Sequence, residues 1–213
     1  MKEYTYSQQD MTDMTFSTIQ SVLTGVILYS SINAITADTK QKKLSCSISA
    51  LLLVITLVSN KRISALYKID DKKQIFLERR INWLITFPLL IFDLFLKLRW
   101  IELEEDGDYN SEYLTEFFLC IILSIVIIGI SFIQDYTEIK LWPFSIILLL
   151  GLYSIIAYVY YKNGDNNVNW WVIPIIITWS IYSVSLVFNI DNYILNFIDI
   201  SKAIFAFLTV TII

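Results

Sequence analysis

The sequence predicts an all-α membrane protein built as a seven-transmembrane-helix bundle. Hydrophobic residues make up 56% of the 213 residues, and the chain contains only 5 Gly and 3 Pro. The mean hydropathy is +0.59, which is typical of proteins that cross a bilayer several times. Apolar stretches near the roughly 20 residues that a helix needs to cross the hydrocarbon recur along the whole chain.

Seven apolar windows can be drawn between short polar connections. Consecutive helices are therefore expected to be antiparallel neighbours in one domain, residues 1–213. The second window is short and rich in Ser and Thr, so we expect it to face protein or water rather than lipid. The windows lie near 16–37, 44–60, 76–98, 113–133, 139–161, 168–188 and 192–213.

The longest connection joins the second window to the third. Ile63, Leu66 and Ile69 have an amphipathic spacing there, which predicts either a short interfacial helix over 62–75 or a solvated, charged linker. Membrane orientation stays open as well. The Lys-rich segment 38–43 favours an outside N-terminus, whereas the charge counts of the other connections favour the reverse.

Several function classes find no support in the composition. The chain has no His, no Gly-rich phosphate loop and no basic tract interleaved with aromatic residues, so histidine catalysis, nucleotide chemistry and nucleic-acid binding are not expected. Cys46 and Cys120 lie in apolar stretches and are expected to pack as small hydrophobic residues, not to hold a metal. No nucleophile–base arrangement is visible, so an enzyme is the least expected class.

Three charged residues lie well inside apolar windows: Asp93, Asp199 and Lys202. A charge at the bilayer centre costs about 2.5–3.5 kcal/mol on insertion scales, so each is expected to face the bundle interior and mark a site. Asp199 and Lys202 are three residues apart on one helix face. A buried lysine amine can condense with an aldehyde to an imine, whose proton needs a carboxylate nearby. A buried ion pair that fixes helix packing is the alternative.

The third window carries a polar stripe. Asn82, Thr86 and Asp93 follow one another at spacings of four and seven and therefore share one helix face. Arg79 precedes them, and Pro88 lies between them in the middle of the window. The stripe is expected to point into the bundle.

Trp83 stands beside Asn82, the sixth window contains "WSIYS", and the seventh contains a lysine. Together with the polar stripe of the third window, these features make the chain resemble the microbial (type 1) rhodopsins. The resemblance implies that Lys202 carries all-trans-retinal as a Schiff base in the centre of the bundle. It assigns Asp199, Asn82, Arg79 and Asp93 to the counterion and gating positions. The other residues that it assigns to the retinal pocket are Trp83, Thr86, Phe87, Trp142, Ser145, Trp179, Tyr182 and Ser183.

The chain departs from the family pattern in three places. Asn82 holds the position of the carboxylate that accepts the proton in outward pumps, and an amide has no useful basicity, which argues against such a pump. Asp199 lies three residues before Lys202 rather than four. A local helix bulge could compensate for this change of spacing. Phe87 and Ser183 alter the pocket, so the sequence does not give the absorption colour.

The compact chain most resembles the viral rhodopsins of group 1, the viral channelrhodopsins, which are light-gated cation channels. This resemblance implies an integral, multi-pass protein of a host-cell membrane whose partners are retinal, the lipid bilayer and monovalent ions; homo-oligomerisation is left open. Asp93, Asp199 and the acidic connection 102–116 would favour cations. Polar residues could line a wet path, namely Ser17, Asn33, Ser45, Ser49, Ser59, Asn192 and Asn196.

Two alternatives to the cation channel stay open. The Asn82–Thr86 pair resembles the chloride-pump pattern, so the protein could be a light-gated anion channel or a light-driven chloride pump, although Asp93 departs from that pattern. The other alternative is a light sensor without transport.

Overall fold

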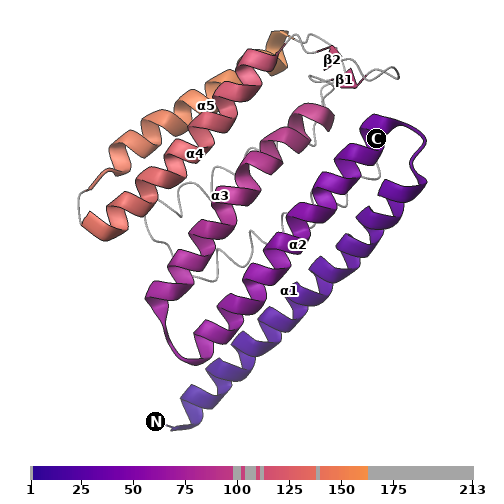
Figure 1. The fold of residues 1–213 in the computed structure, drawn as a ribbon. Coiled ribbons are helices and arrows are strands. Elements are labelled where there is room, and N and C mark those ends of the chain that lie inside the picture. Colours follow the sequence, from indigo (N-terminus) through magenta and orange to yellow (C-terminus); the bar gives the residue numbers. More distant parts are fainter. Residues whose placement is uncertain (1, 98–101, 104–108, 111–112, 138–139, 163–213) are drawn as a thin grey trace.

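The computed structural model describes residues 2–97, 102–103, 109–110, 113–137 and 140–162 (Figure 1). The elements are α1 (Lys2–Thr36), α2 (Lys40–Lys68), α3 (Lys72–Lys97), β1 (Glu102–Leu103), β2 (Tyr109–Asn110), α4 (Leu114–Thr137) and α5 (Trp142–Lys162). The predicted all-α class is confirmed. One small antiparallel ribbon, in which Glu102 pairs with Asn110 and Leu103 with Tyr109, lies in the acidic connection. The last two apolar windows lie outside the described residues.

The described helices lie side by side along a common direction, and α3 occupies the middle of the row (Figure 1). α3 packs against α2 on one side and against α4 on the other, while α1 covers α2 and α5 covers α4. Each helix is therefore next to its neighbour in the chain, as short connections require. The consequence for the site is that α3 is shielded on two sides by protein.

Four of the five described helices contain a stretch long and apolar enough to cross a membrane, and α3 does not. These stretches are Asp13–Thr36, Lys40–Lys68, Leu114–Gln134 and Trp142–Lys162. Their exposed side chains include many large hydrophobic residues, for example Leu28, Phe118 and Ile147, as lipid-facing surfaces require. Because α3 lies between α2 and α4, its polar residues can be buried against protein.

Side-chain caps set the ends of two helices. Thr39 precedes α2 and its side chain accepts a hydrogen bond from the backbone N–H of Lys42. Asp71 precedes α3, and its Oδ1 accepts one from the backbone N–H of Gln74 at 3.0 Å. Both satisfy a backbone donor that the first turn of a helix leaves without a partner. Between the two helices, Asp70 adopts a φ of 53°, a conformation that Asp tolerates better than most residues.

The connection over 62–75 is divided between α2 and α3 instead of forming an interfacial helix or an extended linker. α2 continues to Lys68, and α3 begins at Lys72. The apolar spacing noted in this segment serves packing, because Ile63 and Ile75 are buried in one cluster with Phe16 of α1, against which Tyr67 packs. The amphipathic pattern of this segment therefore reflects side-chain packing at one end of the helix bundle.

The same end of the bundle carries two ion pairs. Arg62 of α2 lies 3.6 Å from Glu78 of α3, and Lys68 of α2 lies 3.5 Å from Asp13 of α1. These pairs place charged side chains of the connection on the outer surface of the cluster formed by α1, α2 and α3. We refer to this as the α2–α3 loop end of the bundle.

Candidate functional site

The polar stripe of α3 is buried, as its spacing predicts. Asn82 and Thr86 are inaccessible to solvent or nearly so, and Asp93 is only 1% exposed. Arg79, one turn before Asn82, is also buried. Since α2 and α4 flank α3, these side chains are shielded by protein rather than by lipid, which is where polar groups inside a membrane protein belong.

Two aromatic residues of α3 pack beside this stripe. Trp83 and Phe87 are one helical turn apart, both are buried, and their ring centroids lie 5.7 Å apart at an interplanar angle of 44°. The contact is of the tilted kind that aromatic pairs prefer. Together they form an apolar wall next to the polar groups of Asn82 and Thr86.

Asp93 is held by two hydroxyl groups of α2. Ser45 Oγ donates to Asp93 Oδ1 at 2.7 Å, and Ser49 Oγ donates to Oδ2 at 2.8 Å. Both serines are buried, and they lie one turn apart on the face of α2 that meets α3. Hydrogen bonds of this length to a carboxylate are charge-assisted and strong. The sequence placed both serines in a polar path but did not predict that they share the carboxylate.

A second group of buried polar side chains lies nearer the α2–α3 loop end. Gln20 Nε2 donates to Asn60 Oδ1 at 3.4 Å, which links α1 to α2. Several other buried polar atoms have no hydrogen-bond partner within the described part of the chain, namely Ser59 Oγ, Asn60 Nδ2, Asn82 Oδ1 and Thr86 Oγ1. Buried polar atoms of this kind normally pair with protein, ligand or water, so this region is suited to hold a polar partner.

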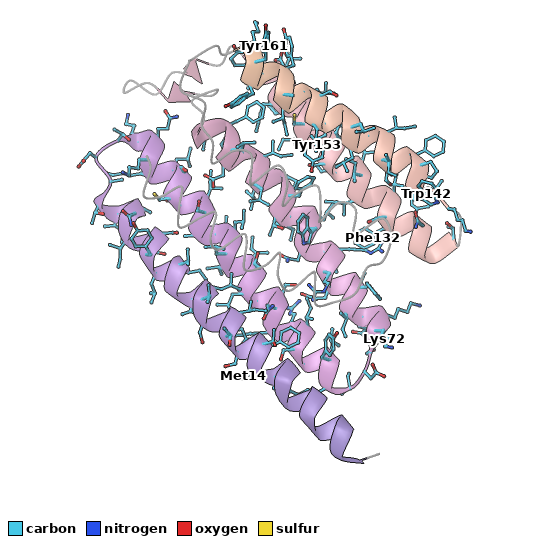
Figure 2. All side chains as sticks on the ribbon, turned by 180° about the vertical axis from the view of Figure 1, so that it is seen from behind. Met14, Lys72, Phe132, Trp142, Tyr153 and Tyr161 are labelled. Carbon is cyan, nitrogen blue, oxygen red and sulfur yellow. The ribbon has the colours of Figure 1, made fainter. Side chains whose placement is uncertain are left out.

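The two predicted pocket residues of α5 differ in exposure. Ser145 is buried, whereas Trp142, the first residue of the helix, is 39% exposed. Figure 2 shows Trp142 at one end of α5 and Tyr161 at the other. Of this pair, only Ser145 is buried inside the bundle.

Sequence reasoning missed one buried charge. The Arg80 guanidinium is buried and donates through Nη1 to the backbone carbonyl of Ser131 in α4. Arg80 stands at the charged edge of its apolar window, beside Arg79, so the sequence pattern did not distinguish it from a surface residue. Its position on the helix could have revealed it, because Arg80 lies away from the Asn82–Thr86–Asp93 stripe and on the side that faces α4.

The remaining predicted site residues lie outside the described part of the chain. They are the lysine of the seventh window, the carboxylate three residues before it and three pocket residues of the sixth window, that is Lys202, Asp199, Trp179, Tyr182 and Ser183. Their roles remain predictions.

No family model matches the chain, and no curated protein matches it either. Solved structures do match. The viral rhodopsin OLPVRII has a TM-score of 0.80 at 15% identity, covering 94% of this chain and 96% of that one. Xanthorhodopsin, a light-driven ion pump with dual chromophore, has a TM-score of 0.69 at 15% identity, covering 96% and 93%. Blue light-absorbing proteorhodopsin from Med12 has a TM-score of 0.65 at 17% identity, covering 94% and 95%.

These matches extend over nearly the whole chain, and they confirm the fold that the resemblance implied. The protein has the fold of the microbial rhodopsins. Together with the four apolar helices, this fold makes it an integral, multi-pass membrane protein.

Proposed function

We propose that the protein is a retinal-binding, light-gated ion channel that conducts monovalent cations. All-trans-retinal would be attached to Lys202 as a Schiff base. The observation that carries the proposal is the buried face of α3: Asn82, Trp83 and Thr86 are enclosed together in a chain that has the rhodopsin fold. A lysine stands in the last apolar window of the same chain.

The residues around α3 fit a polyene with one polar end. Trp83 and Phe87 offer a buried aromatic wall, while Asn82 Oδ1 and Thr86 Oγ1 are buried polar atoms without partners among the described residues. Ser145, buried on α5, adds a hydroxyl. When bound, retinal supplies a photoisomerisation that turns light into a change of shape. Trp142, Trp179, Tyr182 and Ser183 would complete the pocket.

The charges around the chromophore favour a switch over an outward proton pump. Asn82 is neutral and cannot accept a proton near neutral pH, which leaves Asp199 as the proposed counterion of the protonated linkage. Arg79, buried one turn before Asn82, would close the pocket at the α2–α3 loop end. Asp93 is already held by two serine hydroxyls and would act in gating.

Cation conduction is supported by the distribution of carboxylates. Asp93 lies on the polar face between α2 and α3, and the acidic connection 102–116 lies at the end of α3 nearer Asp93. Negative groups along a path concentrate cations and repel anions. The TM-score of 0.80 to a viral rhodopsin further supports the viral group, and with it a host-cell membrane as the location.

A second candidate is a light-gated anion channel or a light-driven chloride pump. The observation in its favour lies at the loop-end half of α3, where Arg79 and Asn82 are both buried. A buried guanidinium beside a neutral amide can attract an anion. The two candidates predict opposite ion dependence.

The test is electrical and optical. The protein is expressed with all-trans-retinal, its visible absorption is recorded, and cells are illuminated under voltage clamp while sodium and chloride are varied separately. A light-gated current whose reversal potential follows sodium supports the cation channel, and one that follows chloride supports the alternative. A stationary photocurrent without reversal would indicate a pump, and a pigment without current a light sensor. Lys202→Ala should abolish the visible band, and a band that persists refutes the retinal site.

A further inference from the structure

The aromatic wall of α3 runs from the side of this helix that meets α2 to the side that meets α4. Asp93 marks the α2 side, and Arg80 marks the α4 side. Because successive residues of a helix are turned by about 100°, Thr86 falls within about 20° of Asp93, and Phe87 falls within about 20° of Arg80. Trp83 lies between Thr86 and Phe87. A retinal whose Schiff base lies near Thr86 and whose chain follows the wall therefore has its other end near Phe87, toward α4.

Two contacts between α3 and α4 bracket the middle of their interface. They are the ring pair Phe95–Phe117, with centroids 5.4 Å apart, and the hydrogen bond from Arg80 to the carbonyl of Ser131. Ser124 stands seven residues from each of the two α4 partners, and Phe87 stands about midway between the two α3 partners. Since α3 and α4 are antiparallel neighbours (Figure 1), Ser124 and Phe87 lie at the same height along the bundle.

Tyr153 of α5 lies at this height as well. At one end of the α4–α5 pair, Lys162 Nζ lies 5.3 Å from the ring centroid of Tyr113. At the other end, the short connection 138–141 joins the two helices. Between these two ends, Tyr153 lies about midway along α5 (Figure 2), as Ser124 does along α4. One residue of α4 and one of α5 thus share the height of Phe87.

The side chains of Ser124 and Tyr153 both bring a hydroxyl oxygen into the core. Ser124 is fully buried, and its Oγ donates to the backbone carbonyl of Ile121 at 2.7 Å. That bond occupies the hydroxyl proton within α4 and leaves the oxygen lone pairs to face a neighbour. The hydroxyl oxygen of Tyr153 is buried too, and Tyr153 packs against the core cluster that contains Phe87. Two oxygen atoms therefore enter an apolar cluster at one height.

We propose that Ser124 and Tyr153 line the end of the retinal pocket opposite the Schiff base and move the absorption of the pigment to longer wavelength. This inference rests on the proposed retinal site and adds to it one residue of α4 and one of α5. The α5 residues that the family resemblance assigns are different ones: Trp142 and Ser145 lie eleven and eight residues before Tyr153.

The direction of the shift follows from the charge of a protonated Schiff base. Its positive charge lies mainly at the nitrogen, and absorption of light moves part of this charge along the conjugated chain toward the other end. Oxygen lone pairs at that end attract the displaced charge, so they lower the energy of the excited state more than that of the ground state. The smaller energy gap corresponds to a longer wavelength.

The alternative is that the two hydroxyls only brace α4 and α5. Both hypotheses allow a loss of stability on substitution, so stability does not separate them. The absorption maximum does, because a hydroxyl remote from the chromophore leaves it unchanged. Each residue has a matched control. Tyr160 lies seven residues after Tyr153, on the same face of α5, and packs against the same core cluster. Ser154 is exposed and, like Ser124, donates to a carbonyl of its own helix at 2.7 Å.

The experiment records the visible absorption of the protein expressed with all-trans-retinal, as wild type, Tyr153→Phe, Ser124→Ala, Tyr160→Phe and Ser154→Ala. Tyr153→Phe and Ser124→Ala are each expected to move the maximum to shorter wavelength by roughly 5–10 nm. Tyr160→Phe and Ser154→Ala should keep the wild-type maximum. Tyr153→Phe retains the aromatic ring and with it the packing; should it form no pigment, Ser124→Ala decides the question by the same measurement.

The outcomes separate this inference from the proposed retinal site. A pigment whose maximum stays at the wild-type wavelength in Tyr153→Phe and Ser124→Ala, or moves to longer wavelength, overturns the inference and leaves the retinal site standing. Equal shifts in the two control variants overturn it as well, since the shift would then follow from a general change of the bundle. A wild type without a visible band refutes the retinal site itself and this inference with it.

Discussion

The pairing of Asp93 with two serines gives a prediction whose size can be worked from the structure. Ser45→Ala and Ser49→Ala each remove one hydroxyl that donates to the carboxylate, at 2.7 and 2.8 Å. A hydrogen bond to a charged group contributes about 1.5–3 kcal/mol in soluble proteins. Interhelical bonds in membrane proteins average about 0.6 kcal/mol and reach about 1.7. We therefore expect each variant to lower the free energy of unfolding by roughly 1–2 kcal/mol.

The double variant sharpens this prediction. Because both hydroxyls serve one carboxylate, their contributions are expected to couple, and the loss in Ser45→Ala/Ser49→Ala should differ from the sum of the single losses by about 0.5 kcal/mol or more. In the Asp93→Leu background the same serine substitutions should lower the free energy of unfolding much less, since the carboxylate that accepts their hydrogen bonds is absent.

The assay is reversible unfolding in mixed micelles, driven by sodium dodecyl sulfate and followed by circular dichroism, which needs no bound chromophore. Ser47→Ala is the matched control. Its hydroxyl donates to the backbone carbonyl of Lys43 in its own helix and is exposed, so its effect should stay within about 0.5 kcal/mol. If Ser45→Ala and Ser49→Ala are indistinguishable from Ser47→Ala, the two hydroxyls do not hold α2 to α3 and the reasoning fails.

Three further predictions concern helix ends, buried charge and the chromophore. Thr39→Ala should lower the free energy of unfolding by about 1 kcal/mol in the same assay, because the Thr39 side chain caps the start of α2. An effect no larger than that of Thr36→Ala would contradict this role. Arg80→Gln should lower the free energy of unfolding by about 1.5–3 kcal/mol, because the buried Arg80 guanidinium of α3 donates to a backbone carbonyl of α4. Arg62→Gln, which removes the exposed partner of the Arg62–Glu78 pair, should lower it by less than about 1 kcal/mol. Equal losses would refute the distinction. Asn82→Asp should give the pigment an additional acid–base transition in its visible spectrum, because a second carboxylate then shares the site proposed for Asp199. A pH dependence identical to that of wild type would argue against Asn82 lying beside the chromophore.

The inner face of α3 was predictable because helix periodicity alone determines it. Asn82, Thr86 and Asp93 fall on one face at spacings of four and seven whatever the neighbouring helices are, and in the structure all three are buried. Their partners were not predictable. The sequence does not state which turn of α2 lies opposite Asp93, since that depends on how the α2–α3 turn at Asp70 sets the register of the two helices.

Helix lengths were predicted less well because hydropathy is not what ends a helix. The second window ends near residue 60, where Lys61 and Arg62 begin a charged stretch. α2 nevertheless continues to Lys68, because backbone hydrogen bonding tolerates charged side chains that point outward. Likewise, hydropathy does not separate Arg80 from Arg62, although one is buried against α4 and the other is exposed.

The two sides of α3 differ in the kind of contact that holds α3 to its neighbours. On the α4 side, Phe117 packs against Phe92 and Phe95 at centroid distances of 5.4 Å each, and Arg80 binds the backbone of α4. On the α2 side, Ser45 and Ser49 donate to Asp93, and Gln41 Nε2 donates to the backbone carbonyl of Leu96; such hydrogen bonds can exchange with water. Separating aromatic rings loses dispersion contacts outright, whereas separating two hydroxyls from a carboxylate lets water take their place. Aromatic packing and a buried guanidinium therefore hold α3 to α4, whereas polar pairs that water can replace contribute to holding α3 to α2.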